Sequence, residues 1–432
     1  MESEDTFSGS GNTVQQHDKD KTSRRIYVNL SGACMIRVAF WYDRPYQYTG
    51  GLNYYKNLLF ALSSLENRKI EPVIYFGKKV DYAVLKDFAP YATVKQTALL
   101  DRGSLHWFLH KVLHKLTGSL FFVNRLMQRD GISVVSHGFE LFGRKRPYAI
   151  INWIPDFQYL RFPELFPDLT PEKYVDWVME PVRQTDLTIL SSRDAFNDFL
   201  KLSRDEKDKV RILHFVSQPT ERIYTISAEK YRASIEKKYG FSGKFFFLPN
   251  QFWKHKNHMV VFEAVNLLKK RGVEILVLCT GNTKDYRSNT SIYADQLSEY
   301  IAAHGLQSNI KILGLIGYDD VLYLMRHSVS VINPSLFEGW SSTVEEAKSL
   351  GKNVVLSNIA VHVEQAPPAA SYFDPHNPGQ LAEILLKKWN ASEGGPDYEL
   401  EAAARENLSA RTRQFGRQYQ DIVLSLSTPS GI

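Results

Sequence analysis

The sequence predicts an α/β protein made of two Rossmann-like domains that face each other across a cleft, and three observations carry this prediction. Its 432 residues exceed what one ordinary hydrophobic core holds. An apolar strand, a glycine pair and an amphipathic helix follow one another over residues 36–62. A second strand, loop, helix and strand run over residues 329–357. We therefore expect ligand-binding loops at the carboxyl ends of the strands in both halves.

The composition excludes several classes of protein. Cys34 and Cys279 are the only cysteines, too few for a disulfide framework or a cysteine-rich metal site. No apolar run is long enough to span a membrane, and the first 25 residues lack the hydrophobic segment of a signal peptide. The net charge of +6 is mild and permits an acidic ligand without indicating one. We expect a cytoplasmic protein with no nucleic-acid partner.

The first 216 residues contain an extension and one domain. Residues 1–34 are polar and are expected to be a disordered extension, so the domain spans residues 35–216. After its first strand, Gly50 and Gly51 precede a helix that begins near Leu52, and glycines there can bring the backbone close to a ligand. A plain turn between strand and helix is the alternative. The other elements expected here are strands at 71–77, 132–136 and 187–191 and a helix at 172–184.

Two polar residues follow strands of this domain. Asp156 lies in a proline-punctuated loop at the expected carboxyl edge of the sheet, where α/β proteins bind ligands, so we consider it a catalytic candidate. His137 comes directly after a strand and is a candidate for the acceptor side of a site. A single histidine in such a place is more often a structural hydrogen-bonding group.

An acid-free segment lies between these strands, at residues 104–129. Apolar residues at 105, 108, 109, 112, 113 and 116 repeat at helical spacing, opposite Lys111, Lys115 and three histidines. This composition resembles an interfacial helix, and we expect it to contact an anionic membrane surface, more strongly as the histidines gain charge. The alternative is an ordinary amphipathic helix that packs its apolar stripe on the domain.

The second half begins after a hinge at residues 217–243, which mixes Pro219, Gly240 and Gly243 with charged residues. Residues 244–400 form the second Rossmann-like domain, residues 401–424 a last helix, and residues 425–432 a tail. Strands are expected at 244–250, 273–281 and 310–317, and helices near 259–271, 319–326 and 373–388.

The segment 334–351 has the strongest functional pattern in the chain. Ser342 and Glu345 have the spacing of a capping box, which predicts a helix start, and Gly351 suits a left-handed C-cap. The free amides and dipole at that helix start, around Ser341–Thr343, suit an anion.

Two carboxylates frame the same helix. Glu338 and Gly339 lie in the preceding loop, and Glu346 lies on the helix with seven residues between the two glutamates. Carboxylates accept hydrogen bonds from pairs of sugar hydroxyls. Acidic residues in the first turns of a surface helix are the bland alternative.

PSLFEGW before the helix and EEAKSLGKNVVLSN after its start strongly resemble the donor-binding signature of retaining glycosyltransferases of the group 1 family, which have the GT-B fold. The resemblance covers about residues 36–424 and implies that the last helix crosses back onto the first domain. It also implies that Glu338 contacts the transferred sugar, that Glu346 contacts the nucleotide ribose, and that Gly50 and Gly51 lie near the donor diphosphate.

The resemblance assigns further donor-binding residues, with two departures. Lys256 matches the phosphate-binding lysine of the family, but Gln251 stands where an arginine is usual, and Lys254 is a candidate for the missing charge. Two solvated lysines are the alternative. Backbone near Ile316 corresponds to the part that reads the nucleotide base. Pro155 precedes Asp156 where many members of the family have a histidine. Glu364 marks one more position near the donor.

The expected function is that of a retaining hexosyltransferase of polysaccharide or lipopolysaccharide biosynthesis, with a nucleotide-sugar donor and a glycan or lipid-linked acceptor. The segments QFWKHKNH and GWSSTVEEAKSLG resemble those of bacterial surface-polysaccharide enzymes, and this resemblance favours GDP-mannose or a similar hexose donor. We expect no metal, because the sequence shows no metal-ligand cluster, and we expect no cofactor. Lys256, Lys254 and the helix start would stabilise the leaving diphosphate. A non-catalytic sugar-nucleotide-binding subunit and a GT-B sugar-nucleotide epimerase remain alternatives. The location expected is cytoplasmic and peripheral on the membrane.

Overall fold

The computed structural model describes residues 35–42, 49–138, 146–225, 228–285 and 290–426. The expected disordered extension at 1–34 and most of the expected tail lie outside these residues. The strands are β1 Ile36–Trp41, β2 Ile70–Phe76, β3 Thr93–Gln96, β4 Val134–Ser136, β5 Ala149–Ile154, β6 Leu187–Leu190, β7 Val210–Ile212, β8 Phe246–Leu248, β9 Val277–Cys279, β10 Ile310–Ile312, β11 Val331–Asn333, β12 Val354–Ser357 and β13 Ala370–Phe373.

The α-helices connect these strands. They are α1 Thr49–Ser63, α2 Tyr82–Phe88, α3 Leu105–Thr117, α4 Phe121–Arg129, α5 Gln158–Arg161, α6 Pro171–Gln184, α7 Arg193–Leu202, α8 Arg222–Thr225, α9 Ala228–Tyr239, α10 His258–Lys270, α11 Ile292–Ala303, α12 Tyr318–His327, α13 Ser342–Ser349, α14 Ala360–Gln365, α15 Pro378–Ala391 and α16 Tyr398–Leu424. Short 3₁₀ turns add η1 Ala98–Leu100, η2 Pro163–Leu165, η3 Lys207–Lys209 and η4 Lys254–Lys256.

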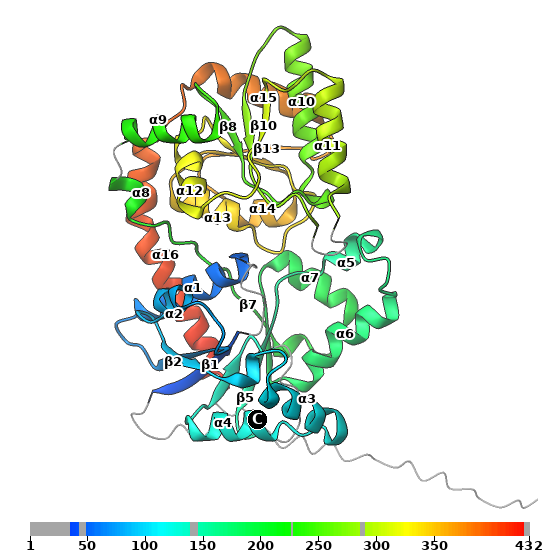
Figure 1. Ribbon diagram of the computed structural model, residues 1–432, viewed down its shortest axis with the longest axis vertical. Helices are drawn as coiled ribbons and strands as arrows, with labels where there is room; N and C mark the ends of the chain where they lie inside the picture. Colours follow the sequence, from blue (N-terminus) through cyan, green and yellow to red (C-terminus); the bar gives the residue numbers. More distant parts are fainter. Residues whose placement is uncertain (1–34, 43–48, 139–145, 226–227, 286–289, 427–432) are drawn as a thin grey trace, which may run out of the picture.

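Two parallel sheets form the frame of the molecule, one in each half (Figure 1). The first sheet has the order β3-β2-β1-β4-β5-β6-β7, and the second has the order β10-β9-β8-β11-β12-β13. Apart from the added β7, both orders correspond to the 3-2-1-4-5-6 arrangement of dinucleotide-binding domains. The prediction of two Rossmann-like halves is therefore confirmed. In both sheets the strand order reverses beside the first strand, which is where such folds bind ligands.

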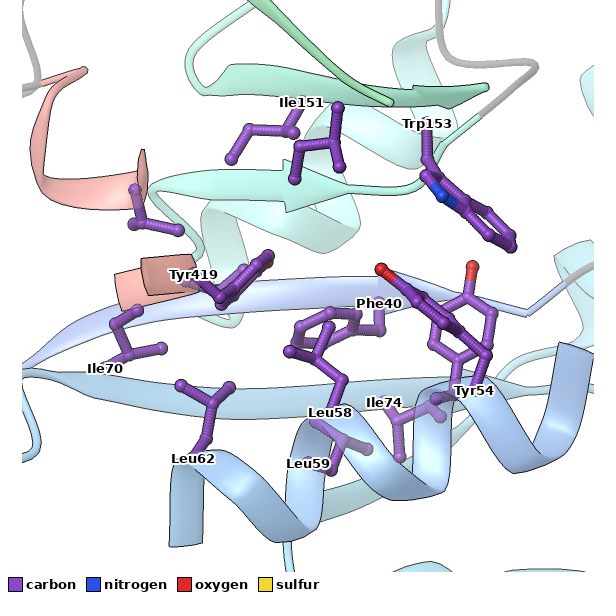
Figure 2. Packing of buried hydrophobic residues seen from close by; sticks show 14 of the residues in the cluster. Phe40, Tyr54, Leu58, Leu59, Leu62, Ile70, Ile74, Ile151, Trp153 and Tyr419 are labelled. Atoms are coloured by element: carbon purple, nitrogen blue, oxygen red, sulfur yellow. The ribbon is translucent and has the colours of Figure 1, made fainter. Parts of the chain in front are cut away.

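The central strands are mostly apolar because helices cover both faces of each sheet. All six residues of β5 and all four of β12 are buried. In the first half, Leu58, Leu59 and Leu62 of α1 pack on β1 and β2 (Figure 2). The same cluster holds Tyr54 stacked on Trp153, with ring centroids 4.4 Å apart.

The long helix α16 joins the two halves. It contacts α13 in the second half and α1 in the first, and it runs along one side of the molecule in Figure 1. Tyr419 of α16 is fully buried in the first hydrophobic core (Figure 2). Gly416 makes this close packing feasible, because a Cβ added there would lie 2.5 Å from the carbonyl oxygen of Ala61 on α1.

The segment expected to be a hinge, 217–243, forms α8 and α9. Ile223 and Ile235 from these helices are buried in the core against the second sheet. In the part of the chain that the structure describes, no helix is both long and apolar enough to cross a membrane.

Candidate active site

Two loops of the second half meet where its strand order reverses. β8 leads into residues 249–257, and its neighbour β11 leads into residues 334–341. The two loops are tied by a hydrogen bond from the amide of Leu336 to the carbonyl oxygen of His255, at 2.8 Å. Asn250 donates to the side-chain oxygen of Asn333 at 2.9 Å. The candidate residues of both loops are therefore held by one network.

Lys256 and Glu338 form an ion pair across these loops. The Lys256 ammonium donates to the Glu338 carboxylate at 2.7 Å, and Ser335 donates to the same oxygen at 2.7 Å. Both charged side chains are largely removed from solvent, with exposed fractions of 14% and 9%. Burial alone would raise the pKa of Glu338, but the Lys256 ammonium and the two hydrogen bonds outweigh it and hold the pKa below its ordinary value. The carboxylate is therefore charged at neutral pH.

The helix after this loop, α13, starts one residue earlier than a Ser342 cap would place it. Its N-cap is Ser341, whose hydroxyl accepts from the amide of Val344, so the expected capping box from Ser342 to Glu345 is wrong. Asn333 fixes the cap by donating to the Ser341 hydroxyl at 2.8 Å. By helix geometry the amides of Ser342 and Thr343 have no acceptor within α13, which leaves its start suited to an anion.

Glu345 has a structural role in place of the expected cap. It is buried and its carboxylate accepts from Arg411 of α16 at 2.5 Å. Gln365 donates to its other oxygen at 3.3 Å. Glu345 thus ties the helix of the candidate site to the helix that joins the two halves.

Glu346 lies on the same helix but in a different environment. It is buried, and Tyr318 donates to its carboxylate at 3.0 Å. Burial raises the pKa of Glu346 to about 7, and the Tyr318 hydrogen bond only partly opposes this shift. Ile316 lies two residues before Tyr318 and is half-buried. Near neutral pH the Glu346 carboxyl is therefore partly protonated, and a hydrogen-bond donor beside it would favour its charged form.

Gln251 and Lys254 both lie in the loop after β8, but their environments differ. Gln251 accepts from the amide of Asn282 at 2.6 Å and so braces two loops. Lys254 is exposed in η4, two residues before Lys256. The exposed ammonium is thus close in sequence to the buried ion pair, while Gln251 holds the loop's shape.

The Glu338 loop also touches the first half of the molecule. A Cβ added to Gly339 would lie 2.2 Å from the carbonyl oxygen of Pro155 and 2.9 Å from the Cβ of Asp156. The Asp156 carboxylate accepts from the amide of Gln158 at 3.1 Å. Glycine at 339 therefore brings Asp156 and the donor-side loop to one place.

The glycine pair and His137 belong to the first half of the molecule. Gly50 and Gly51 are in the first turn of α1, because the helix begins at Thr49 and not near Leu52. His137 is only 3% exposed. Its ring nitrogens bond Tyr54 at 2.9 Å and Ser136 at 2.8 Å. Those contacts hold the His137 ring in place, and its role on the acceptor side stays a prediction.

Sequence reasoning missed a second contact between the halves. Glu364 of α14 accepts from the amide of Arg193 at 2.7 Å and from His214 at 2.7 Å, so it caps α7. Its expected position near the donor stays a prediction. The His214 ring stacks on Trp340 with centroids 4.1 Å apart. Trp340 in turn donates to the carbonyl oxygen of Phe215 at 3.1 Å. The one feature of the sequence that could have indicated this second contact is the position of Trp340 directly after Gly339.

An open cavity of about 400 Å³ lies beside this second contact. Its walls include residues of α7 and of the turn into α14, namely Arg193, Asp194, Asn197, Asn358, Ile359, Ala360, Val363 and Glu364. None of the donor-side candidates in the loops after β8 and β11 lines it.

Residues 232–408 match the family model described as "Glycosyl transferases group 1". This segment is similar to the group 1 glycosyl transferases. It contains both loops of the candidate site and all of α13. The search of curated proteins gave no match.

Solved structures show that the two halves together form a GT-B fold. A glycosyltransferase from Rickettsia africae matches with a TM-score of 0.62 and 16% identity, over 92% of this chain and 100% of that chain. HepE from Anabaena, in complex with UDP and glucose, matches with a TM-score of 0.62 and 15% identity, over 90% and 100%. The lipopolysaccharide outer core galactosyltransferase WaaB matches with a TM-score of 0.58 and 12% identity, over 90% and 99%.

At these identities the solved structures establish the fold alone. The family match includes the loops after β8 and β11. The GT-B fold and the group 1 resemblance expected from the sequence are thus both confirmed.

Proposed function

We propose that the protein is a retaining, metal-independent glycosyltransferase that moves a hexosyl group from a nucleotide-sugar donor to a glycan or lipid-linked acceptor. The observation that carries this proposal is the convergence of Lys256, Glu338 and the start of α13 at the contact with the Asp156 loop. Lys256 and the start of α13 can bind negative charge, and the carboxylates of Glu338 and Asp156 can accept from hydroxyls. A sugar diphosphate has both kinds of group.

The diphosphate end of the donor is assigned to the positive side. Bond cleavage leaves negative charge on the diphosphate, so groups that favour this charge lower the barrier. The Lys256 ammonium and the amides of Ser342 and Thr343 supply such groups without a metal. Lys254 is an exposed cation near the same loop and can follow the diphosphate as it leaves.

The sugar end of the donor is assigned to Glu338. Its carboxylate is charged and already fixed by Lys256 and Ser335, so it can accept hydrogen bonds from sugar hydroxyls without reorganising. Asp156 approaches from the first domain, and we assign it to the acceptor side of the sugar. The roles of Glu338 and Asp156 are therefore to orient the sugar and its acceptor.

The nucleoside is assigned to the surroundings of Glu346. Two ribose hydroxyls can donate to this carboxylate, and Ile316 contributes backbone near the base. Gln251 keeps the phosphate loop in shape, while Gly50 and Gly51 bring the start of α1 toward the cleft. The expected front-face mechanism, in which acceptor and leaving group share one face of the sugar, needs no protein nucleophile.

The identities of the donor and the acceptor are proposed from the loop sequences and from two of the similar solved structures. The loop sequences favour GDP-mannose, whereas the HepE structure contains UDP and glucose. A polysaccharide or lipopolysaccharide acceptor agrees with the function named for WaaB. We propose a hexose donor, with GDP-mannose tested first and UDP-glucose second.

A panel of nucleotide sugars tests the proposal. Release of nucleoside diphosphate, measured with and without candidate acceptors, should occur with one donor and fall about 100-fold in a Glu338→Gln variant. If the wild type and Glu338→Gln both bind a nucleotide sugar but release no nucleoside diphosphate, the result would favour the non-catalytic subunit. Conversion of the free donor to its epimer would favour a GT-B epimerase. Either result would overturn the proposal.

A further inference from the structure

Helix α3 has its apolar face in solvent. Five large apolar side chains of this helix are exposed, with Leu105, Phe108 and Leu116 at 68%, 57% and 78%. Leu109 and Val112 complete the stripe. At about 100° per residue, the five side chains fall within an arc of roughly 100° on one face. This face therefore does not pack on the domain, which is what an ordinary amphipathic helix would do.

The opposite face of α3 is the one turned toward the protein. His110 is buried, and its ring lies against that of His114, with centroids 6.2 Å apart. Trp107 is half-buried on the same side. The expected solvent face with three histidines is thus wrong, because only His106 of the three is exposed. Exposing the leucines and burying the histidines costs free energy in water, so this helix suits a less polar surrounding.

The helix is well anchored even though its apolar face is free of contacts with the core. Ser104 caps it by accepting from the amide of Trp107, and Gly118 ends it in the left-handed conformation with φ of 66°. The stripe from Leu105 to Leu116 is therefore a rigid rod of about 16 Å.

The surroundings of the stripe are positively charged. No acidic residue occurs from 102 to 129. Lys111 and Lys115 flank one edge of the stripe, with Lys115 exposed, and Arg102 and Arg125 are also exposed. Phe121, the first residue of α4, adds another exposed aromatic ring, at 50%. Apolar side chains bordered by cations match the boundary of an anionic bilayer, where the chains enter the headgroup region and the cations meet phosphates.

The place of α3 in the molecule fits the same partner. Helices α3 and α4 lie at the end of the first domain that is remote from the second domain (Figure 1). A surface that covers α3 would therefore leave the loops after β8 and β11 uncovered. An acceptor anchored in that surface would be presented to the first domain.

We propose that the exposed face of α3, defined by Leu105, Phe108, Leu109, Val112 and Leu116, docks the protein on an anionic lipid bilayer. Contact is hydrophobic along the stripe and electrostatic through Lys111 and Lys115. The inference does not rest on the proposed transfer reaction, because binding to a bilayer requires no sugar donor.

Co-sedimentation of the full chain with lipid vesicles tests the proposal. Vesicles of phosphatidylcholine with 30% phosphatidylglycerol should pellet the protein, and phosphatidylcholine alone should pellet much less. A Phe108→Ser, Leu116→Ser variant should bind the anionic vesicles at least tenfold more weakly. A Lys111→Gln, Lys115→Gln variant should lose the preference for anionic lipid and the sensitivity of binding to salt.

An Ile292→Ser, Tyr398→Ser variant is the matched control. It removes side chains of similar exposure, 61% and 71%, from the second half of the chain and should bind like the wild type. The serine substitutions at positions of known high exposure, Phe108, Leu116 and the control pair, should leave the melting temperature at the wild-type value, because only exposed side chains change there. Equal pelleting of all variants, or none for the wild type, would overturn the proposal. A wild-type dimer that the Phe108→Ser, Leu116→Ser variant dissociates, without vesicle binding, would assign the face to a second copy.

Discussion

The pKa of Glu346 gives a prediction that separates ribose binding from the rest of the site. Burial raises this pKa to about 7, so the carboxylate is largely protonated at pH 6 and largely charged at pH 8. If ribose hydroxyls bind the charged form, that form is only about one-tenth populated at pH 6, which weakens binding about tenfold between the two pH values. Replacing Glu346 with glutamine removes a charge-assisted contact of about 1.5–3 kcal/mol, or roughly 10- to 150-fold in affinity at pH 8.

Calorimetry with a nucleoside diphosphate at pH 6, 7 and 8 measures this effect. The terminal phosphate also titrates in this range, but it does so equally for the wild type and Glu346→Gln. The dissociation constant of Glu346→Gln divided by that of the wild type should therefore increase with pH. Glu338→Gln is the matched control and should bind the free diphosphate nearly as well as the wild type. A ratio that stays constant from pH 6 to 8, or an equal loss in both variants, would refute the assignment.

The same pKa predicts how stability changes with pH. Because the folded pKa of Glu346 lies above its ordinary value of 4.5, its contribution is fully present below 4.5 and is lost as pH rises through about 7. Without a ligand, the wild type should lose stability relative to Glu346→Gln between pH 6 and 8. Urea unfolding at each pH measures the difference, and parallel curves for the two proteins would contradict it.

Three further predictions concern packing. Gly339→Ala should push the two domains apart and lower turnover about 100-fold while nucleotide affinity stays within a factor of about two, and unchanged turnover would contradict the close contact. Gly416→Ala should cost about 1–3 kcal/mol in urea unfolding, because the new methyl group meets the Ala61 carbonyl, and wild-type stability would show that α16 packs differently. Lys256→Met should cost about 3–5 kcal/mol by leaving Glu338 charged and buried without its partner, and adding Glu338→Gln should recover most of the loss; additive losses would disprove the pairing.

The sequence predicted the central strands better than the edges of the sheets. The strands β1, β2, β4, β8 and β11 are apolar runs, because helices cover both of their faces, and such runs are recognisable in the sequence. Of the strands that it missed, β3, β7 and β13 lie at sheet edges, and only β5 lies inside a sheet. The edge strand β3 reads TVKQ and has no buried residue, so its sequence resembles a loop.

The sequence predicted which residues belong to the candidate site, but it did not predict which of them contact one another. Glu338, Glu346 and Lys256 lie in local patterns whose strand and helix context could be read directly. That Lys256 pairs with Glu338, 82 residues away, depends on the neighbouring positions of β8 and β11. The bond from Glu364 to the start of α7 depends on how two domains pack, which local patterns do not encode.

A crystal structure with the nucleoside diphosphate that most raises the melting temperature would test the central claim most directly. The account predicts that Lys256 and the amides of Ser342 and Thr343 contact the diphosphate, and that both ribose hydroxyls donate to Glu346. The Glu338 carboxylate should then border the empty sugar position beside Asp156. A nucleotide bound away from α13, or one whose ribose does not reach Glu346, would contradict the account.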